Sequence, residues 1–356
     1  MNRIRDIQQR LDSRGIDAML LLSAVNRRYA AGFPSSDGAL LVTRGDAWFF
    51  TDSRYIEAAR AALTGVAEVG LTEMAKTRKD WLCERLAASG VQKLGIEEAR
   101  LSHAEFLRLE QALTVALIPA EALITELRAA KSPAEKERLI AAQRLAEAAF
   151  LEVLALLAPG LTERQIAAEL VYRMLRHGAE GLAFEPIVVG GPRGSMPHGV
   201  PGDRPVQRGE FVTMDFGCVL DGWCSDTTRT VALGAASEEM QLVYGTVLRA
   251  QGTGIAAARA GVPGSEIDAA GRRIIEDAGF GEYFGHSFGH SLGMECHEGP
   301  NAAPRETRIM PAGAVISAEP GIYLPGRFGV RIEDVLYLTP TGAENITRLS
   351  KDLLIL

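Results

Sequence analysis

The dipeptide Asp221-Gly222 is the feature that most constrains the fold, because it favours a tight two-residue turn between antiparallel strands. Residues 210–219 before it alternate in the manner of a strand. If the two strands pair directly across the turn, Gly217 faces Asp226. Asp226 then shares a face with Asp215, one diagonal step and roughly 7 Å away. A one-residue slip would turn one of these acids to the other face.

Two carboxylates this close in a largely apolar hairpin repel each other, and each raises the other's pKa unless a cation lies between them. An acid inside a strand-like apolar segment is also unusual, because burying an unpaired charge is costly. The pair therefore indicates a bound cation. The alternative is that each aspartate lies at a strand end and caps backbone groups, as in ordinary turns.

A second acid-bearing pattern follows further along the chain. The apolar segment 314–316 leads to Glu319, and the dipeptide Pro320-Gly321 comes directly after it. Arg331 and Glu333 share one face by the two-residue period of a strand, whereas Asp334 points the other way. This charged run is either a solvated edge or a second lining of the same site.

The stretch from Gly285 to Pro300 contains His286, His290 and His297, which are half of the six histidines in the chain. Glycines recur between them, and glycine lets the backbone approach a ligand closely. Histidine and carboxylate are common ligands of divalent transition metals. The stretch is either a glycine-rich loop with surface histidines or part of a metal site.

Four carboxylates and one imidazole form the candidate ligand set: Asp215, Asp226, Glu319, Glu333 and a histidine. Such a set can hold two divalent ions if some carboxylates bridge them, and its hard oxygen ligands favour Mn²⁺, Co²⁺, Fe²⁺ or Zn²⁺ over a thiolate site. Two ions about 3.5–4 Å apart can hold a bridging water as hydroxide and polarise a carbonyl oxygen. The set predicts hydrolysis of an amide or a phosphoester.

The chain of 356 residues is longer than the usual single domain, so two domains are expected. Strands and helices alternate up to about residue 130, which predicts an α/β domain with a mixed or parallel sheet. A capping box with proline at the first helical position, Ser132-Pro133-Ala134-Glu135, then opens a long helix. We place an N-terminal α/β domain at residues 1–128 and a second domain at residues 129–356.

Individual elements of the first domain are also predicted. Strands are expected near residues 18–23, 40–43, 48–51, 66–70 and 93–97. Helices are expected at residues 3–15, from a cap at Ser53 to about Leu63, at 78–89, and after a capping box at Ser102. His103 in that last helix is expected on the surface. In the second domain, helices are expected after Thr162 and over residues 237–260 and 265–278.

Composition excludes several classes of function. The net charge is −7 and no run of like charge stands out, which argues against nucleic-acid binding. Four scattered cysteines without a CxxC pair indicate reduced thiols in the cytosol. The N-terminus lacks the apolar region of a signal peptide. No apolar run approaches the roughly 18 residues needed to span a bilayer. The expected location is cytoplasmic.

Taken together, the motifs resemble the pita-bread metallopeptidases, which include Xaa-Pro aminopeptidase, Xaa-Pro dipeptidase (prolidase) and methionine aminopeptidase. The matching segments, in family order, are Met-Pro-His-Gly at 196–199, Met-Asp-Phe-Gly at 214–217, Ser-Asp-Thr-Thr-Arg-Thr at 225–230, 289–298, Glu-Pro-Gly-Ile-Tyr at 319–323 and Val-Arg-Ile-Glu-Asp at 330–334. The resemblance extends over the whole chain. It implies a creatinase-like α/β N-terminal domain and an α+β pita-bread catalytic domain.

The resemblance also implies a role for each metal ligand. Asp215 would chelate one metal, Asp226 and Glu333 would bridge both, and His290 and Glu319 would complete the second. Two divalent ions per chain are expected, Mn²⁺ before Co²⁺, Zn²⁺ or Fe²⁺.

The remaining site residues take catalytic roles by the same resemblance. Glu319 would also accept the proton of the metal-bound water. His297 would contact the substrate carbonyl, and His198 would bind near the scissile bond. His286 and Arg331 would line the substrate pocket and support the ligands.

Four residues depart from common choices in the family: Phe288, Ser291, Cys296 and Ser317. They could tune the shape of the pocket, and Cys296 is expected to pack as an apolar side chain.

The expected activity is that of a dinuclear aminopeptidase, in which a metal-bridging hydroxide hydrolyses the N-terminal Xaa-Pro bond. Xaa-Pro dipeptidase is the alternative, followed by a metal-free amidinohydrolase or a non-catalytic peptide-binding relative. The substrates would be peptides with proline at the second position. The family further implies a homodimer, and the loop Phe33–Asp37 could reach the partner's active site.

Overall fold

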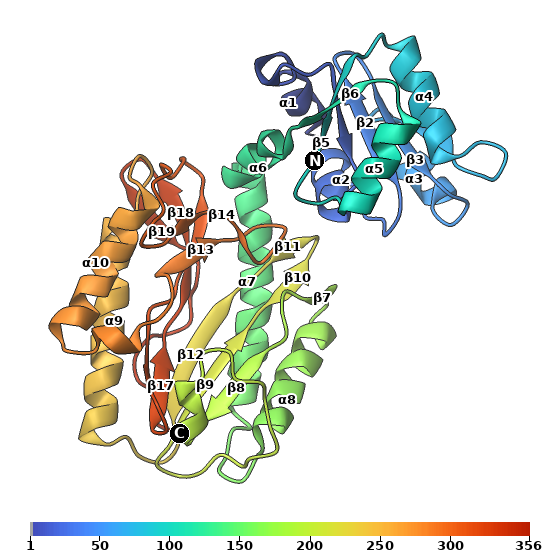
Figure 1. Cartoon of the computed structure of the whole chain (residues 1–356). Helices are drawn as coiled ribbons and strands as arrows, with labels where there is room; N and C mark the ends of the chain where they lie inside the picture. Colours follow the sequence, from blue (N-terminus) through green and yellow to red (C-terminus); the bar gives the residue numbers. More distant parts are fainter. Residues whose placement is uncertain (1–2) are drawn as a thin grey trace. The chain divides into compact units, whose positions relative to one another are not determined.

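The computed structural model describes residues 3–356. The chain divides into two compact units, with the boundary between Arg128 and Ala129 (Figure 1).

The first unit is built on a mixed sheet of six strands in the order β4-β3-β2-β1-β5-β6. Its strands are β1 Ala18–Leu21, β2 Ala39–Thr43, β3 Ala47–Thr51, β4 Glu68–Leu71, β5 Lys93–Ile96 and β6 Ala116–Pro119. β1, β2 and β3 pair antiparallel, whereas β4, β5 and β6 each pair parallel to a neighbour. The predicted α/β class with a mixed sheet is confirmed, and each of the five predicted strands lies within two residues of its expected ends.

The helices of this unit are α1 Ile4–Gln8, α2 Ala24–Ala31, α3 Ile56–Ala62, α4 Arg78–Ala88, α5 His103–Ala112 and α6 Glu121–Ala129. The helix predicted at residues 3–15 is shorter, because α1 gives way to a 3₁₀ turn over Asp12–Arg14 that Gly15 ends in the left-handed region. Ser53 does not cap α3. Asp52 instead accepts a hydrogen bond from the backbone N–H of Arg54 (2.9 Å), forming a turn that delays the helix.

Helix α2 is absent from the predictions because polar residues interrupt its apolar pattern. Asn26 and Arg27 are both buried there. Asn26 Nδ2 donates to Glu97 Oε1 (2.6 Å) and Arg27 Nη2 donates to the carbonyl of Ser35 (2.9 Å). Such pairs satisfy the buried polar groups only after distant segments have come together, so hydropathy alone does not reveal the helix.

The second unit contains four long helices: α7 Pro133–Leu154, α8 Glu163–Arg176, α9 Glu238–Ala257 and α10 Gly264–Asp277. The capping boxes at Ser132 and Thr162 are present, as is the box at Ser102 in the first unit. Two 3₁₀ turns cover Gly191–Ser195 and Gly281–Tyr283.

The strands of this unit form three-stranded sheets β12-β9-β8 and β11-β10-β7, a five-stranded sheet β14-β13-β15-β18-β19, and the pair β16-β17. Their bounds are β7 Gly181–Leu182, β8 Ile187–Gly190, β9 Phe211–Phe216, β10 Cys218–Leu220, β11 Trp223–Cys224, β12 Thr227–Ala232, β13 Gly289–Ser291, β14 Glu298–Ala302, β15 Val315–Ala318, β16 Gly321–Leu324, β17 Phe328–Arg331, β18 Asp334–Thr339 and β19 Gly342–Asn345. Figure 1 shows the strands between two helix pairs, with α7 and α8 on one side and α9 and α10 on the other.

Strand β9 shows how this arrangement creates an interior site. Val212, Met214 and Phe216 belong to the apolar core beneath α7 and α8, and the rings of Phe216 and Phe150 stack at 5.0 Å. The alternate residues of β9, including Asp215, therefore face away from those helices.

Phe288 belongs to the core. Its ring fits against Gly254 of α9 and Gly271 of α10, where an added Cβ would come within 2.2 Å and 2.4 Å of the ring. Ser291 is also fully buried. Neither residue lines the cavity that holds the candidate site, so these two departures could affect its shape only through packing behind the wall.

In the part of the chain that the structure describes, no helix combines the length and the apolar character required to cross a membrane.

Candidate metal centre and active site

The hairpin register predicted from the sequence is confirmed. Asp221 and Gly222 both have positive φ, at 50° and 80°, as a tight primed turn requires. Asp215 on β9 lies opposite Thr228 on β12. Asp226 is therefore the diagonal neighbour of Asp215, and both buried carboxylates line one cavity.

The second acid-bearing pattern lines the same cavity. β15 ends at Ala318 and presents Glu319, while Glu333 lies between β17 and β18. The backbone N–H of Glu333 donates to the carbonyl of Thr228 (3.1 Å), which joins this segment to the hairpin. Glu333 is 1% exposed. The alternative of a solvated edge is therefore excluded.

His290 on β13 faces this group of acids. Its Nε2 lies 3.4 Å from Asp226 Oδ2 and 3.3 Å from Glu319 Oε1, while Nδ1 lies 3.2 Å from the carbonyl of Ser291. Ser317 Oγ accepts a hydrogen bond from the backbone N–H of His290 and donates one to Glu319 Oε1, both at 2.9 Å. Ser317 therefore holds His290 and Glu319 in place through these hydrogen bonds, although it does not itself line the cavity.

The electrostatics of the acids favour a bound cation. Burial raises the pKa of Asp215 to about 7, against the lowering effect of Arg331, and burial also raises the pKa of Glu319 and Glu333. Burial opposes protonation of His290, but its hydrogen bond to Asp226 and the charge of Glu319 raise its pKa to about 9. The acids thus attract positive charge, whether a proton on the imidazole or a metal ion.

Unused ligand atoms support the same conclusion. Among the residues described, neither Asp215 Oδ1 nor Glu333 Oε1 has a hydrogen-bond partner, although both atoms are buried. Ligand atoms of Asp226, His290 and Glu333 all lie within 4.8 Å of one another. Buried carboxylate oxygens without partners are costly unless a cation satisfies them. The residues present therefore fit divalent metal ions.

Arg331 and Tyr323 form a hydrogen-bonded wall beside the acids. Arg331 Nη2 donates to Asp215 Oδ2 (2.6 Å), its Nη1 donates to Tyr323 Oη (2.9 Å), and its Nε donates to Thr228 Oγ1 (3.0 Å). His286 Nε2 lies 2.9 Å from the same Tyr323 oxygen. Burial and the charge of Arg331 lower the pKa of His286 to about 4. This histidine is therefore neutral near pH 7.

Tyr323 and Thr228 are site residues to which the sequence analysis assigned no role, although both lie in recognised motifs. Thr228 Oγ1 donates to Glu333 Oε2 (2.9 Å). Tyr323 lies on β16, four residues after Glu319. Gly321 and Gly329 leave room for its side chain, since an added Cβ would come within 2.5 Å of the hydroxyl oxygen at Gly321 and within 2.9 Å of the ring at Gly329. Its place at the end of the Glu-Pro-Gly-Ile-Tyr segment was the signal that could have identified Tyr323.

All nine predicted site residues line one cavity of about 830 Å³. They are His198, Asp215, Asp226, His286, His290, His297, Glu319, Arg331 and Glu333. His198 and His297 are exposed residues, but the imidazole of His297 is partly buried, and this partial burial and the charge of the neighbouring His290 lower its pKa. Cys296 lines the same cavity. His103 is exposed, as predicted, and does not line it.

Comparisons with known proteins agree with this geometry. Residues 137–340 match the metallopeptidase family M24, and residues 3–130 match the creatinase/prolidase N-terminal domain. The chain is 31% identical to the Xaa-Pro dipeptidase of Pyrococcus horikoshii, over 99% of this chain and 98% of that protein.

Two solved structures resemble the whole chain. A Bacillus anthracis Xaa-Pro dipeptidase superposes with a TM-score of 0.95 at 38% identity, covering 99% of both chains. A Thermotoga maritima X-Pro aminopeptidase superposes with a TM-score of 0.92 at 35% identity, covering 98% of this chain and 99% of that one. The predicted fold class is confirmed. The chain belongs to the metallopeptidase family M24, with a creatinase N-terminal α/β domain followed by a pita-bread catalytic domain.

Proposed function

We propose that this protein is a metal-dependent exopeptidase that hydrolyses Xaa-Pro dipeptides. The observation that carries the proposal is the convergence of four buried carboxylates and His290 in one cavity of a chain of this family. The preference for proline rests on the names of the relatives, two of which are Xaa-Pro dipeptidases. These relatives favour the dipeptidase alternative over the aminopeptidase expected from the sequence.

The ligand set remains the one proposed from the sequence. Asp215, Asp226, His290, Glu319 and Glu333 would hold two divalent ions, with Mn²⁺ as the first candidate because the ligands are mostly hard oxygens. When bound, the ions supply Lewis acidity, which activates a water molecule and polarises the scissile carbonyl.

Residues of the chain perform the proton transfers and position the substrate. Glu319, oriented by Ser317, would accept the proton of the attacking water. His297 and His198, both exposed in the cavity, would donate hydrogen bonds to the substrate carbonyl and to the group beside the scissile bond. An Xaa-Pro bond has no N–H, so binding must rely on contacts to other atoms.

The wall formed by His286, Tyr323 and Arg331 has a different task. Because His286 is neutral near pH 7, it serves as a fixed hydrogen-bonding surface rather than as an acid. Arg331 balances part of the negative charge through its contact with Asp215. Arg331 would keep Asp215 in place, and the three side chains together would hold the pocket wall during turnover.

A second candidate, aminopeptidase action on longer peptides, is favoured by the charge of the cavity. Among the described lining residues, the arginines are Arg164 and Arg331 and there is no lysine. Arg331 is buried and paired with Asp215, whereas Arg164 is 67% exposed and paired with Asp203 at 2.9 Å, so neither arginine is a buried cation free to bind a substrate carboxylate. A dipeptide carries a carboxylate beside its scissile bond, which a free cation would bind well. A longer peptide makes no such demand.

One assay distinguishes these activities. Purified protein loaded with Mn²⁺ is incubated with Ala-Pro, Ala-Pro-Ala and, as a control, Ala-Ala. Cleavage of Ala-Pro alone supports the dipeptidase, and release of alanine from Ala-Pro-Ala supports the aminopeptidase. Failure to cleave either proline peptide would overturn the proposal. Activity that survives complete removal of metal would instead indicate a metal-free hydrolase.

We also propose that the protein is a homodimer, as the family resemblance implies. Light scattering of the purified chain tests the state directly. In the loop Phe33–Asp37, Phe33 is buried against Phe49 with their rings 5.6 Å apart, and Ser35 is buried as well. The exposed Pro34 and Ser36 and the partly exposed Asp37 could therefore contact a partner without rearrangement.

A further inference from the structure

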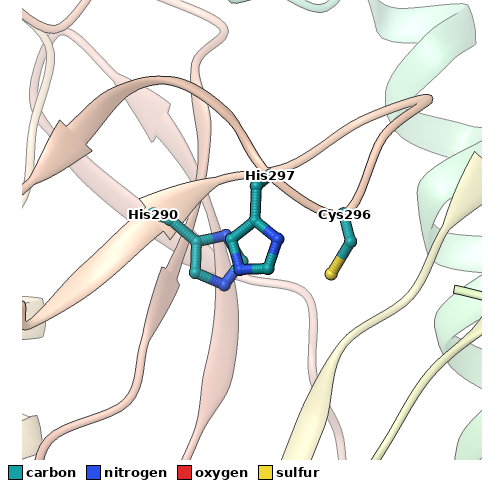
Figure 2. A group of neighbouring side chains, drawn as sticks. All are labelled: His290, Cys296 and His297. Atoms are coloured by element: carbon teal, nitrogen blue, oxygen red, sulfur yellow. The ribbon is translucent and has the colours of Figure 1, made fainter. Parts of the chain in front are cut away.

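A second group of metal-ligating side chains overlaps the carboxylate site. His290, Cys296 and His297 each offer a ligand atom, and these atoms lie within 4.8 Å of one another. Figure 2 shows the imidazole rings of His290 and His297 beside each other, and Cys296 on the loop next to His297. The centroids of the two imidazole rings are 4.2 Å apart. A thiol and two imidazoles suit a softer ion than the oxygen-rich set does.

Asp226 completes this group as a fourth ligand. Cys296 Sγ donates to Asp226 Oδ2 at 3.3 Å, and the same oxygen lies 3.4 Å from His290 Nε2. One sulfur, two nitrogens and one oxygen form a four-ligand set of the composition that Zn²⁺ accepts in tetrahedral sites. Cys296 is 9% exposed and lines the cavity, so an ion can reach it.

We propose that Cys296, His297, His290 and Asp226 form a site for a thiophilic divalent ion, Zn²⁺ or Cd²⁺, whose occupation inhibits the enzyme. The inference rests on the proposed function, because His290 and Asp226 belong to both ligand sets. An ion held by the thiolate would withdraw these two residues from the catalytic set. It would also engage His297, which otherwise faces the substrate. When the ion binds, a sulfur–metal bond forms and the thiol proton leaves to solvent.

Cysteine is the residue that makes this site selective. Carboxylate ligands suit Mn²⁺, whereas a thiolate shifts the preference of a site towards Zn²⁺ and Cd²⁺. Valine at position 296 would keep the approximate volume and the apolar packing but remove the sulfur. Cys224 provides a matched control, because it is also buried and belongs to no group of three metal-ligating residues among those described.

The test titrates Zn²⁺ and Cd²⁺ into Mn²⁺-loaded wild type, Cys296→Val and Cys224→Ala, with activity normalised to each variant's own Mn²⁺ value. Inhibition of Cys296→Val should require at least about tenfold more Zn²⁺, since even partners of metal ligands change affinity by that factor. Wild type and Cys224→Ala should show ultraviolet thiolate-to-cadmium charge-transfer absorption, and Cys296→Val should not. Circular dichroism checks that the variants fold, and Cys296→Ala repeats the test if valine does not fit.

Equal inhibition and equal absorption in wild type and Cys296→Val would overturn the proposal. Absorption from Cys296 without inhibition would overturn the regulatory part. The cadmium absorption does not depend on turnover, so the site can be tested even if no peptide is cleaved. Failure of the proposed function is thus distinguishable from failure of this inference.

Discussion

At the scale of single residues, the surroundings of each histidine decide whether it can act in the site. His290 faces Asp226 and Glu319 at 3.3–3.4 Å in the cavity, whereas His103 is exposed at the start of α5. The same side chain therefore has a site role in one place and a surface role in the other.

Replacing a ligand should abolish turnover. His290→Ala or Glu333→Ala is expected to lower kcat/KM by more than about 100-fold, because loss of a direct ligand exceeds the loss of a supporting partner. Metal content measured after gel filtration should fall with activity. His103→Ala is the control and should match wild type. Equal losses at positions 103 and 290 would contradict the ligand assignment.

Tyr323 is expected to act by holding Arg331 and His286. Tyr323→Phe removes one hydroxyl that contacts both side chains at 2.9 Å. We expect kcat to fall about tenfold, which is the scale of one buried hydrogen bond, with bound metal unchanged. Parallel loss of metal would show that the tyrosine supports the ligand set instead.

His286 should make stability depend on pH. Its pKa in the folded chain is about 4, below the ordinary 6.5, because burial and Arg331, Arg272 and His198 disfavour the imidazolium. Below pH 6.5 the unfolded chain takes up a proton that the folded chain does not, so stability falls as pH drops from 6.5 towards 4. His286→Asn should show a shallower decline in urea unfolding free energy over this window. An unchanged slope would refute this account.

At the scale of elements, the loop between β13 and β14 depends on a buried ion pair. Lys131 Nζ lies 2.9 Å from Glu298 Oε2, and the two side chains are 0% and 6% exposed. Glu298 Oε1 accepts from the N–H groups of Met294 (2.9 Å) and Glu295 (3.2 Å). The pair thus anchors the loop that carries His297.

Breaking this pair should destabilise the fold and loosen the loop. Lys131→Met leaves the Glu298 carboxylate buried without its cation, at a cost of about 3 kcal/mol in unfolding free energy. KM should rise because His297 is less well placed. Lys136→Met is the matched control, since its partner Glu344 is 52% exposed and such pairs contribute below about 1 kcal/mol. Equal unfolding free energies for the two variants would disprove the anchoring role.

At the scale of the whole molecule, the candidate active site lies within the second unit, where its residues span positions 198 to 333. The four acids, on β9, just before β12 and after β15 and β17, line one cavity. These strands lie between the two helix pairs (Figure 1). Metal binding would therefore connect the strands that pack against α7 and α8 with those that pack against α9 and α10.

Removing metal should lower the thermal stability of the protein. Mn²⁺ at about 100 times its Kd would add about 2.7 kcal/mol by mass action, and it would relieve repulsion among the buried acids. Calorimetry should show Tm falling after chelation and recovering with Mn²⁺. Glu333→Ala should lose most of this shift. An identical Mn²⁺ effect in that variant would place the stabilising ion elsewhere.

The sequence predicted the features that depend on residues close together in the chain. The register across Asp221-Gly222 follows from turn geometry, and the capping boxes at Ser102 and Ser132 follow from contacts three residues apart. It did not predict α2, whose buried Asn26 is satisfied by Glu97, 71 residues away. Nor did it show that Phe288 packs between two helix glycines.

The identity of the acids and their strand faces was thus available from the sequence, because side-chain direction in a strand repeats every two residues. That Glu319, Glu333 and His290 join the hairpin acids was implied by the family resemblance and not by any local pattern. The tertiary structure brings them together, because core packing brings β13, β15 and β12 together. It also decided that Cys296, expected to be apolar filling, lies 3.3 Å from Asp226. Such contacts join distant residues, and no local pattern encodes them.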